Sequence, residues 1–79
     1  MDAVDKKITL HSFTVDEEFR FLNQTIAQSH IGEKHDSIVV AIERNDELIT
    51  LDKDTTFQLG DLVWIVGNRE KIREILYLT

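Results

Sequence analysis

Apolar residues along the chain concentrate in two short runs, IVVAI at residues 38–42 and LVWIV at residues 62–66. Both runs are rich in β-branched side chains and too short for a typical helix, so they predict two buried strands. Between them, Asn45 and Asp46 predict a two-residue hairpin turn, because both side chains tolerate left-handed backbone angles. Residues 48–51 predict a short partner strand. The polar residues 52–56 predict a loop, and Gly60-Asp61 predicts a second turn.

The N-terminal part predicts a strand that ends irregularly. Residues 7–11 alternate between polar and apolar side chains, which is typical of a half-buried strand. Ile8 and Leu10 share one face of this strand, whereas Phe13 and Val15 fall on the other. A shift of one residue in the alternation predicts a bulge or the end of the strand.

Two helices are predicted from apolar spacing. Phe19, Leu22 and Ile26 recur at helical intervals. A capping box of residues 14 and 17 is a candidate start for this helix, and Gly32 is a plausible stop. A last helix is predicted over residues 69–76, with Asn68 as its N-cap.

The stretch from residue 37 to residue 67 also resembles a known family. Its elements are IER at 42–44, NDELI at 45–49, DTT at 54–56, GD at 60–61 and VG at 66–67. In this order and spacing they resemble the RCK C-terminal domain, also called the TrkA-C domain, over roughly residues 7–76. The resemblance implies an α+β fold in the order β-α-β-β-β-α, a small mixed sheet with two helices packed on it. It also favours a first helix over residues 23–29, with Asn23 where the family usually has glycine. The domain is expected over residues 7–79, after a linker or added start at residues 1–6.

Length and charge narrow the possible partners. Seventy-nine residues predict one domain with a thin core, which often gains stability from a partner. The net charge of -6 gives no electrostatic footprint for phosphate backbones, so no nucleic-acid partner is expected. The chain has no cysteine for disulfides and no apolar run of about 20 residues for a membrane span. A secretory leader is not expected.

Candidate chemical groups favour structural roles over catalysis. The three histidines, at positions 11, 30 and 35, lack a metal-binding motif and are interpreted as scattered surface residues. Glu43 and Arg44 are expected in cross-strand pairs or on a solvated edge, and the Asp61 side chain is expected to bond local backbone N–H groups. Trp64 is expected in the core or against a second subunit. No nucleophile elbow or phosphate-binding glycine loop is present, so an enzyme is not predicted, nor is any cofactor or metal.

The family resemblance implies a regulatory function. Such domains are cytosolic modules of potassium channels, potassium-uptake systems or cation/proton antiporters, on the cytoplasmic side of the cell membrane. They typically form homodimers, and some bind a small ligand such as a nucleotide or cyclic dinucleotide, which would shift the transporter between states. The alternative is a structural dimerisation module that binds no ligand.

The resemblance also places a candidate ligand site. Cyclic di-AMP binders of the family use the end of the first helix and the connection to the second strand, which is SHIGEKHD at residues 29–36. Their usual Asp-x-Arg pair is replaced here by His30 and Gly32. The residues expected to line a ligand are Ile31, Glu33 and His35. An independent metal-binding module is a third hypothesis, and it would require His30 and His35 to converge.

Overall fold

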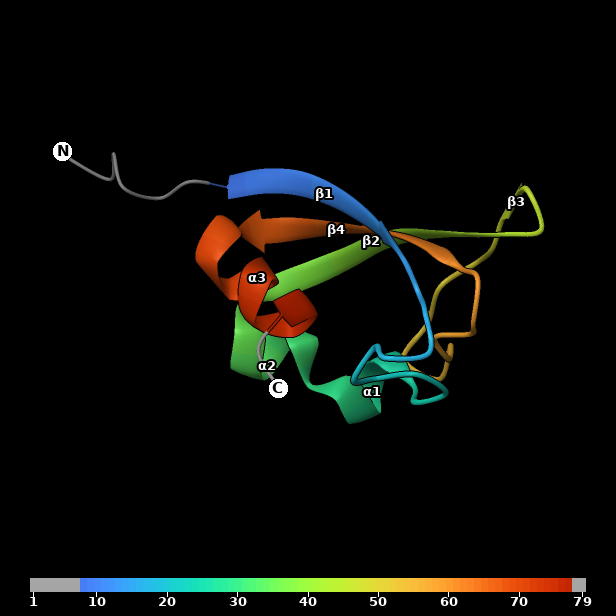
Figure 1. Cartoon of the computed structure of the whole chain (residues 1–79), viewed down its shortest axis with the longest axis horizontal. Helices are drawn as coiled ribbons and strands as arrows, with labels where there is room; N and C mark the ends of the chain where they lie inside the picture. Colours follow the sequence, from blue (N-terminus) through green and yellow to red (C-terminus); the bar gives the residue numbers. More distant parts are fainter. Residues whose placement is uncertain (1–7, 78–79) are drawn as a thin grey trace, which may run out of the picture.

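The two apolar runs form the two central strands of one sheet. A computed structural model of the protein describes residues 8–77. Its four strands are β1 (Ile8–Thr14), β2 (Ser37–Arg44), β3 (Glu47–Leu48) and β4 (Leu62–Asn68), in the spatial order β1-β4-β2-β3 (Figure 1). The α+β class is as predicted, and the order of elements matches β-α-β-β-β-α except that two short helices lie where one was expected. All neighbouring strands pair antiparallel, so the expectation of a mixed sheet was wrong on this point.

The irregularity in the sheet lies in β2, not in β1. β1 pairs with β4 without interruption from Ile8 to Thr14, which overturns the bulge expected near residue 12. In β2 the register shifts between Val39 and Ala41, so Val40 has no partner in β4. A bulge of this kind places two residues of one strand opposite one of the other and turns neighbouring side chains toward the same face. The alternation in β1 looks shifted only because Ile8 and Leu10 occupy the outer face, while Phe13 faces inward.

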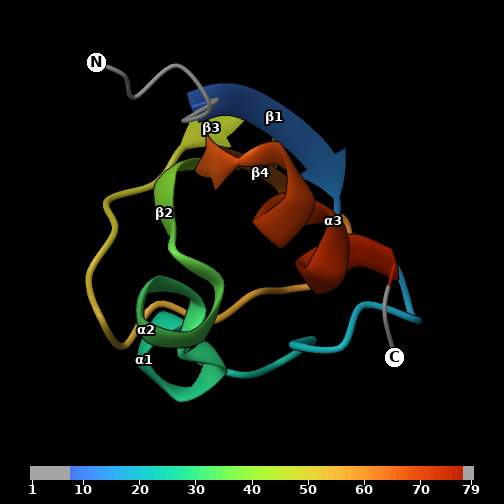
Figure 2. The ribbon, with the colours of Figure 1, turned by 90° about the vertical axis from the view of Figure 1, so that its left-hand side faces the viewer.

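Three short helices gather on one side of the sheet (Figures 1 and 2). They are α1 (Ile26–Ser29), α2 (Ile31–His35) and α3 (Arg69–Tyr77). α3 is the predicted C-terminal helix, and the Asn68 side chain accepts a hydrogen bond from the N–H of Glu70, as expected of an N-cap. The single helix expected over residues 23–29 is shorter than predicted, and a second helical turn follows it.

Backbone conformation and helix capping explain why α1 and α2 are two separate helices. Asn23 has a φ of 67°, the left-handed conformation that asparagine tolerates better than most residues. Thr25 caps α1 in a capping box with Gln28, whereas the alternative start at residues 14 and 17 is not used. His30 then takes a left-handed conformation and ends α1, and Asp36 does the same at the end of α2. Gly32 lies inside α2, so the prediction that it stops the helix was wrong.

The core lies between the inner face of the sheet and the helices. Ile42, Val63 and Ile65 are fully buried on the inner face, and Ile72 and Ile75 of α3 are buried against it. The remaining core comes from the segment between β1 and α1, from the start of α2 and from the loop before β4: Val15, Phe19, Phe21, Ile31 and Phe57. Burial of a side chain of this size contributes about 1.5–3 kcal/mol each, so this cluster supplies most of the folding free energy of a small domain.

Both turns of the central stretch form as the sequence predicts. Asn45 and Asp46 have φ values of 55° and 66°, as a type I′ hairpin turn requires. β3 contains only Glu47–Leu48, so the partner strand is shorter than the predicted residues 48–51. The expected linker at residues 1–6 lies outside the described residues.

Candidate functional site

The segment predicted to bind a ligand is held by short local contacts. The N–H groups of Ile26 and Ala27 donate to the carbonyls of Thr55 and Lys53, which ties α1 to the loop before β4. At the junction between α1 and α2, the Ser29 hydroxyl donates to the Ile26 carbonyl at 2.6 Å. These bonds satisfy backbone groups that helices of four and five residues leave open at their ends.

The three predicted ligand residues do not share one exposed surface. Ile31 is 2% exposed and belongs to the core. Glu33 is exposed, and its carboxylate Oε1 lies 2.6 Å from Nδ1 of His30. His35 is largely buried: its side chain is 12% exposed, and its ring meets the Phe21 ring edge-on with centroids 6.1 Å apart. Of the three residues, Glu33 alone presents its side chain to solvent.

Each of the two histidines in this segment lies next to one carboxylate. The hydrogen bond with His30 and the charge of that ring lower the pKa of the Glu33 carboxyl below its ordinary value of 4.5. The Nδ1 atom of His35 lies 3.6 Å from Oε1 of Glu74 in α3, too far for a hydrogen bond, and it has no other hydrogen-bond partner. His30 and His35 therefore face different carboxylates and do not converge.

The outer face of the sheet is apolar and uncovered. Leu10, Val66 and Ile38 are aligned across three strands, with Leu10 and Ile38 58% and 65% exposed. Ile8 and Val40 extend this row with further exposed side chains. Trp64 lies on the same face, half-buried, with its indole Nε1 donating to Oε2 of Glu43 at 3.1 Å. Trp64 is therefore not a core residue, and the sequence pattern alone could not assign its face.

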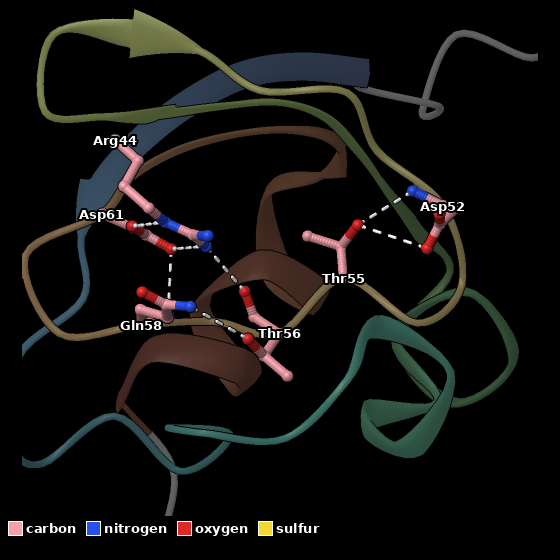
Figure 3. A network of polar contacts seen from close by, with 6 residues as sticks. All are labelled: Arg44, Asp52, Thr55, Thr56, Gln58 and Asp61. Carbon is pink, nitrogen blue, oxygen red and sulfur yellow. Dashed lines mark hydrogen bonds and ion pairs between the residues drawn. The ribbon is translucent and has the colours of Figure 1, made fainter.

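A buried ion pair closes the far end of β2, and sequence reasoning missed it. Nε and Nη2 of Arg44 donate to the two oxygens of Asp61, each at 2.8 Å, and Nη2 also donates to the Thr56 carbonyl (Figure 3). The N–H of Gln58 donates to Oδ2 of Asp61. Arg44 was expected on a cross-strand pair or a solvated edge, whereas the expected local backbone bond of Asp61 is present.

This pair changes the acid–base properties of both groups. Burial raises the pKa of Asp61, but the hydrogen bonds from Arg44 and Gln58 and the charge of Arg44 outweigh it and lower that pKa below its ordinary value of 3.8. The hydrogen bond to Asp61 also raises the pKa of Arg44. The pair therefore stays ionised over the neutral range and acts as a structural clamp.

Comparison with known families decides the identity of the domain. The family profile of the TrkA-C domain matches residues 10–78. The chain belongs to the TrkA-C family. This family, also known as RCK C-terminal, consists of regulatory domains. A comparison with curated proteins finds no match.

Solved structures share the fold of this TrkA-C domain. The RCK_C domain dimer of S. agalactiae BusR in complex with c-di-AMP superposes with a TM-score of 0.72 at 19% identity, covering 89% of this chain and 97% of that one. S. agalactiae BusR in complex with its busAB-promotor DNA gives 0.72 at 19% identity, covering 87% and 36%. A BusR complex with busA-promotor DNA gives 0.73 at 17% identity, covering 100% and 41%. The TrkA-C domain thus spans well under half of these two chains.

These neighbours correct one expectation. The net charge of -6 predicted no nucleic-acid partner, yet BusR, which contains this fold, is found bound to promoter DNA. The prediction was wrong because the charge of one domain describes only its own surface. It carries no information about the rest of a longer protein.

Within residues 8–77, no group of three or more histidine, aspartate or glutamate side chains is arranged to hold a metal ion. None of the described helices is long and apolar enough to cross a membrane.

Proposed function

We propose that this TrkA-C domain is the ligand-sensing regulatory part of a cation channel, transporter or antiporter, on the cytoplasmic side of the cell membrane, and that it acts as a homodimer. Family membership supports the regulatory role. The apolar outer face is the main support for a homodimer. Clusters of exposed apolar side chains such as Leu10 and Ile38 mark interaction surfaces. A ligand that prefers one arrangement of the dimer shifts the transporter between states.

The ligand site is proposed at the junction of α2 and β2. Asp36 ends α2 and is followed directly by Ser37 and the exposed Ile38, so the predicted ligand segment runs into the pairing face. A small ligand there would contact both copies. Glu33 is the proposed direct contact, while Ile31 and His35 hold α2 against the core and α3. A cyclic dinucleotide is the first candidate, since a similar RCK_C dimer was solved with c-di-AMP.

A thermal-shift titration with c-di-AMP, run beside light scattering, tests this function. A ligand that binds only the folded dimer raises the melting temperature with its concentration. We expect c-di-AMP to stabilise a dimer and Glu33→Gln to weaken the response. A dimer that responds to no nucleotide, cyclic dinucleotide or cation would instead be a structural pairing module. The substitution of the usual Asp-x-Arg pair by His30 and Gly32 favours that second function.

The pairing face is tested separately by charge insertion. Ile38→Glu places a carboxylate in the apolar row and should convert a dimer to a monomer, because a buried unpaired charge is strongly unfavourable. Leu59→Glu is the matched control, because Leu59 is 59% exposed but lies in the loop before β4. If Ile38→Glu stays dimeric while Leu59→Glu becomes monomeric, the copies pair through another surface.

A further inference from the structure

Three consecutive carboxylates form a ridge between two hollows on the surface. Asp16, Glu17 and Glu18 follow β1 and are all exposed. On one side, a hollow of about 450 Å³ is lined by Phe13, Phe19, Leu76 and Tyr77, with Asp16 and Glu18 at its rim. A second hollow beside the same ridge is lined by Val15, Leu59 and Gly60. Neither hollow includes the α2–β2 junction or the apolar row of the outer sheet face.

The ridge holds its shape without neutralising its charge. Oδ1 of Asp16 accepts from the N–H of Glu18 at 2.9 Å, and the carbonyl of Asp16 accepts from the N–H of Phe19. Within residues 8–77, no lysine, arginine or histidine forms an ion pair with any of the three carboxylates. The three adjacent carboxylates therefore concentrate negative charge on this part of the surface.

The floor of the hollow of about 450 Å³ is aromatic. The rings of Phe13 and Phe19 lie 5.2 Å apart between centroids, tilted by 46°. Phe19 also meets Phe21 and Phe57 edge-on, at 5.6 Å and 5.4 Å, so the floor is anchored in the core. Tyr77, 71% exposed, forms part of the wall.

We propose that this surface binds a lysine- or arginine-bearing segment of a partner protein. Lysine and arginine combine an apolar stem with a cationic head, which matches an aromatic floor beside a carboxylate rim. An anionic ligand would be repelled by the ridge. A divalent ion lacks the clustered ligands that it needs, because no such group occurs among the described residues.

The source of the segment rests on the proposed function. Cytoplasmic loops of membrane proteins carry an excess of lysine and arginine, so a transporter beside this domain would present such segments. The acidic surface would then dock the domain against the transporter, while pairing and ligand binding use the sheet face and the α2–β2 junction. The two inferences therefore involve different residues and can fail separately.

The probe is a short synthetic peptide of alternating arginine and leucine, titrated into the isotope-labelled domain and followed by NMR. We expect shifts centred on Asp16, Glu18 and Tyr77. Affinity should fall steeply between about 50 mM and about 500 mM salt, because the charges are exposed. A peptide with glutamate in place of arginine should not bind.

Charge-removing variants test whether the carboxylates of the ridge are responsible for binding the arginine peptide. Glu17→Gln with Glu18→Gln should weaken binding roughly five- to tenfold, as expected for the loss of two exposed ion pairs. Glu33→Gln with Glu47→Gln removes the same charge elsewhere and should change affinity less than about twofold. Tyr77→Ala should weaken binding without changing its salt dependence.

Some outcomes would overturn the proposal. They are equal affinity of the two double variants, shifts that map to another surface, or no binding of the arginine peptide at low salt. Dimer mass and the c-di-AMP response are measured on the same variants. Glu17→Gln with Glu18→Gln should still form a dimer and still respond to c-di-AMP, because neither residue lies at the pairing face or the α2–β2 junction. A failure of this inference therefore does not count against the proposed function, and a failure of the proposed function does not count against this inference.

Discussion

At the scale of single residues, Arg44 and Asp61 carry the largest electrostatic consequence. The Asp61 side chain is 1% exposed and is satisfied by Arg44 and by the N–H of Gln58. Removal of one partner from a buried pair leaves a buried charge uncompensated, which is more destabilising than a surface ion pair is stabilising. The stability of the domain should therefore depend on this carboxylate far more than on the exposed acids.

Asp61→Ala should lower the free energy of unfolding by about 3 kcal/mol, because Arg44 loses its partner and the Gln58 N–H loses its acceptor. Urea denaturation measures this change. Asp54→Ala is the control: its side chain is 77% exposed, and the effect should stay within about 0.5 kcal/mol. Equal effects of the two substitutions would show that the buried pair contributes nothing particular.

The same carboxylate predicts how stability depends on pH. Its pKa in the folded protein lies below the ordinary 3.8, so the folded state binds this proton less readily than the unfolded state does. The contribution of Asp61 is therefore complete above the ordinary pKa and is lost as pH falls through the folded pKa. Urea denaturation between about pH 5 and pH 2 should show a steep loss in the wild type and a flatter one in Asp61→Asn. Glu33→Gln should leave most of that steepness in place, because Glu33 is exposed.

The sequence predicted residue conformations that depend on near neighbours. Asn45 and Asp46 form the expected turn, and Asn23 takes the left-handed conformation, because these preferences belong to the side chains themselves. The partner of Arg44 was missed because it lies 17 residues further along the chain. Only the fold brings the two together. Likewise, the family resemblance placed Ile31 among the candidate ligand contacts but could not show that it points into the core.

At the scale of elements, the contact between the start of β2 and the end of β4 requires glycine. A Cβ at Gly67 would lie 2.5 Å from Oγ of Ser37, 3.0 Å from its Cβ and 3.1 Å from the carbonyl of Asp36. This close approach sets the path by which α2 leads into the sheet. The sequence showed a glycine after an apolar run, which a turn explains equally well, so the close approach could not be predicted.

Gly67→Ala should destabilise the domain by about 1–3 kcal/mol, since the added methyl group overpacks against Ser37 and the Asp36 backbone. Ser37→Gly should recover part of that loss in the double variant, which chemical denaturation of all four proteins would detect as coupling. Gly32→Ala is the matched control: its nearest neighbour is 3.8 Å away inside α2, so alanine should be neutral or stabilising. Additive effects of Gly67→Ala and Ser37→Gly would contradict this explanation.

At the scale of the whole molecule, the apolar face favours the association of two copies, whereas their negative charge opposes it. The outer row of Leu10, Val66 and Ile38 carries no charge, whereas the chain as a whole carries -6. Two copies that meet at this row gain apolar burial but bring two negative bodies together. Added salt screens that repulsion without weakening the apolar contact.

Dimer affinity should therefore rise with salt, and this distinguishes the pairing face from the acidic ridge at residues 16–18. Sedimentation equilibrium between about 20 mM and about 500 mM sodium chloride should show a falling dissociation constant, because the Debye length shrinks well below the size of the domain. Binding of the arginine peptide should weaken over the same range. Glu33→Gln with Glu47→Gln lowers the negative charge and should flatten the salt dependence of dimerisation. A dimer that dissociates as salt rises would be held by ion pairs, and the uncharged row across β1, β4 and β2 would then not be its interface.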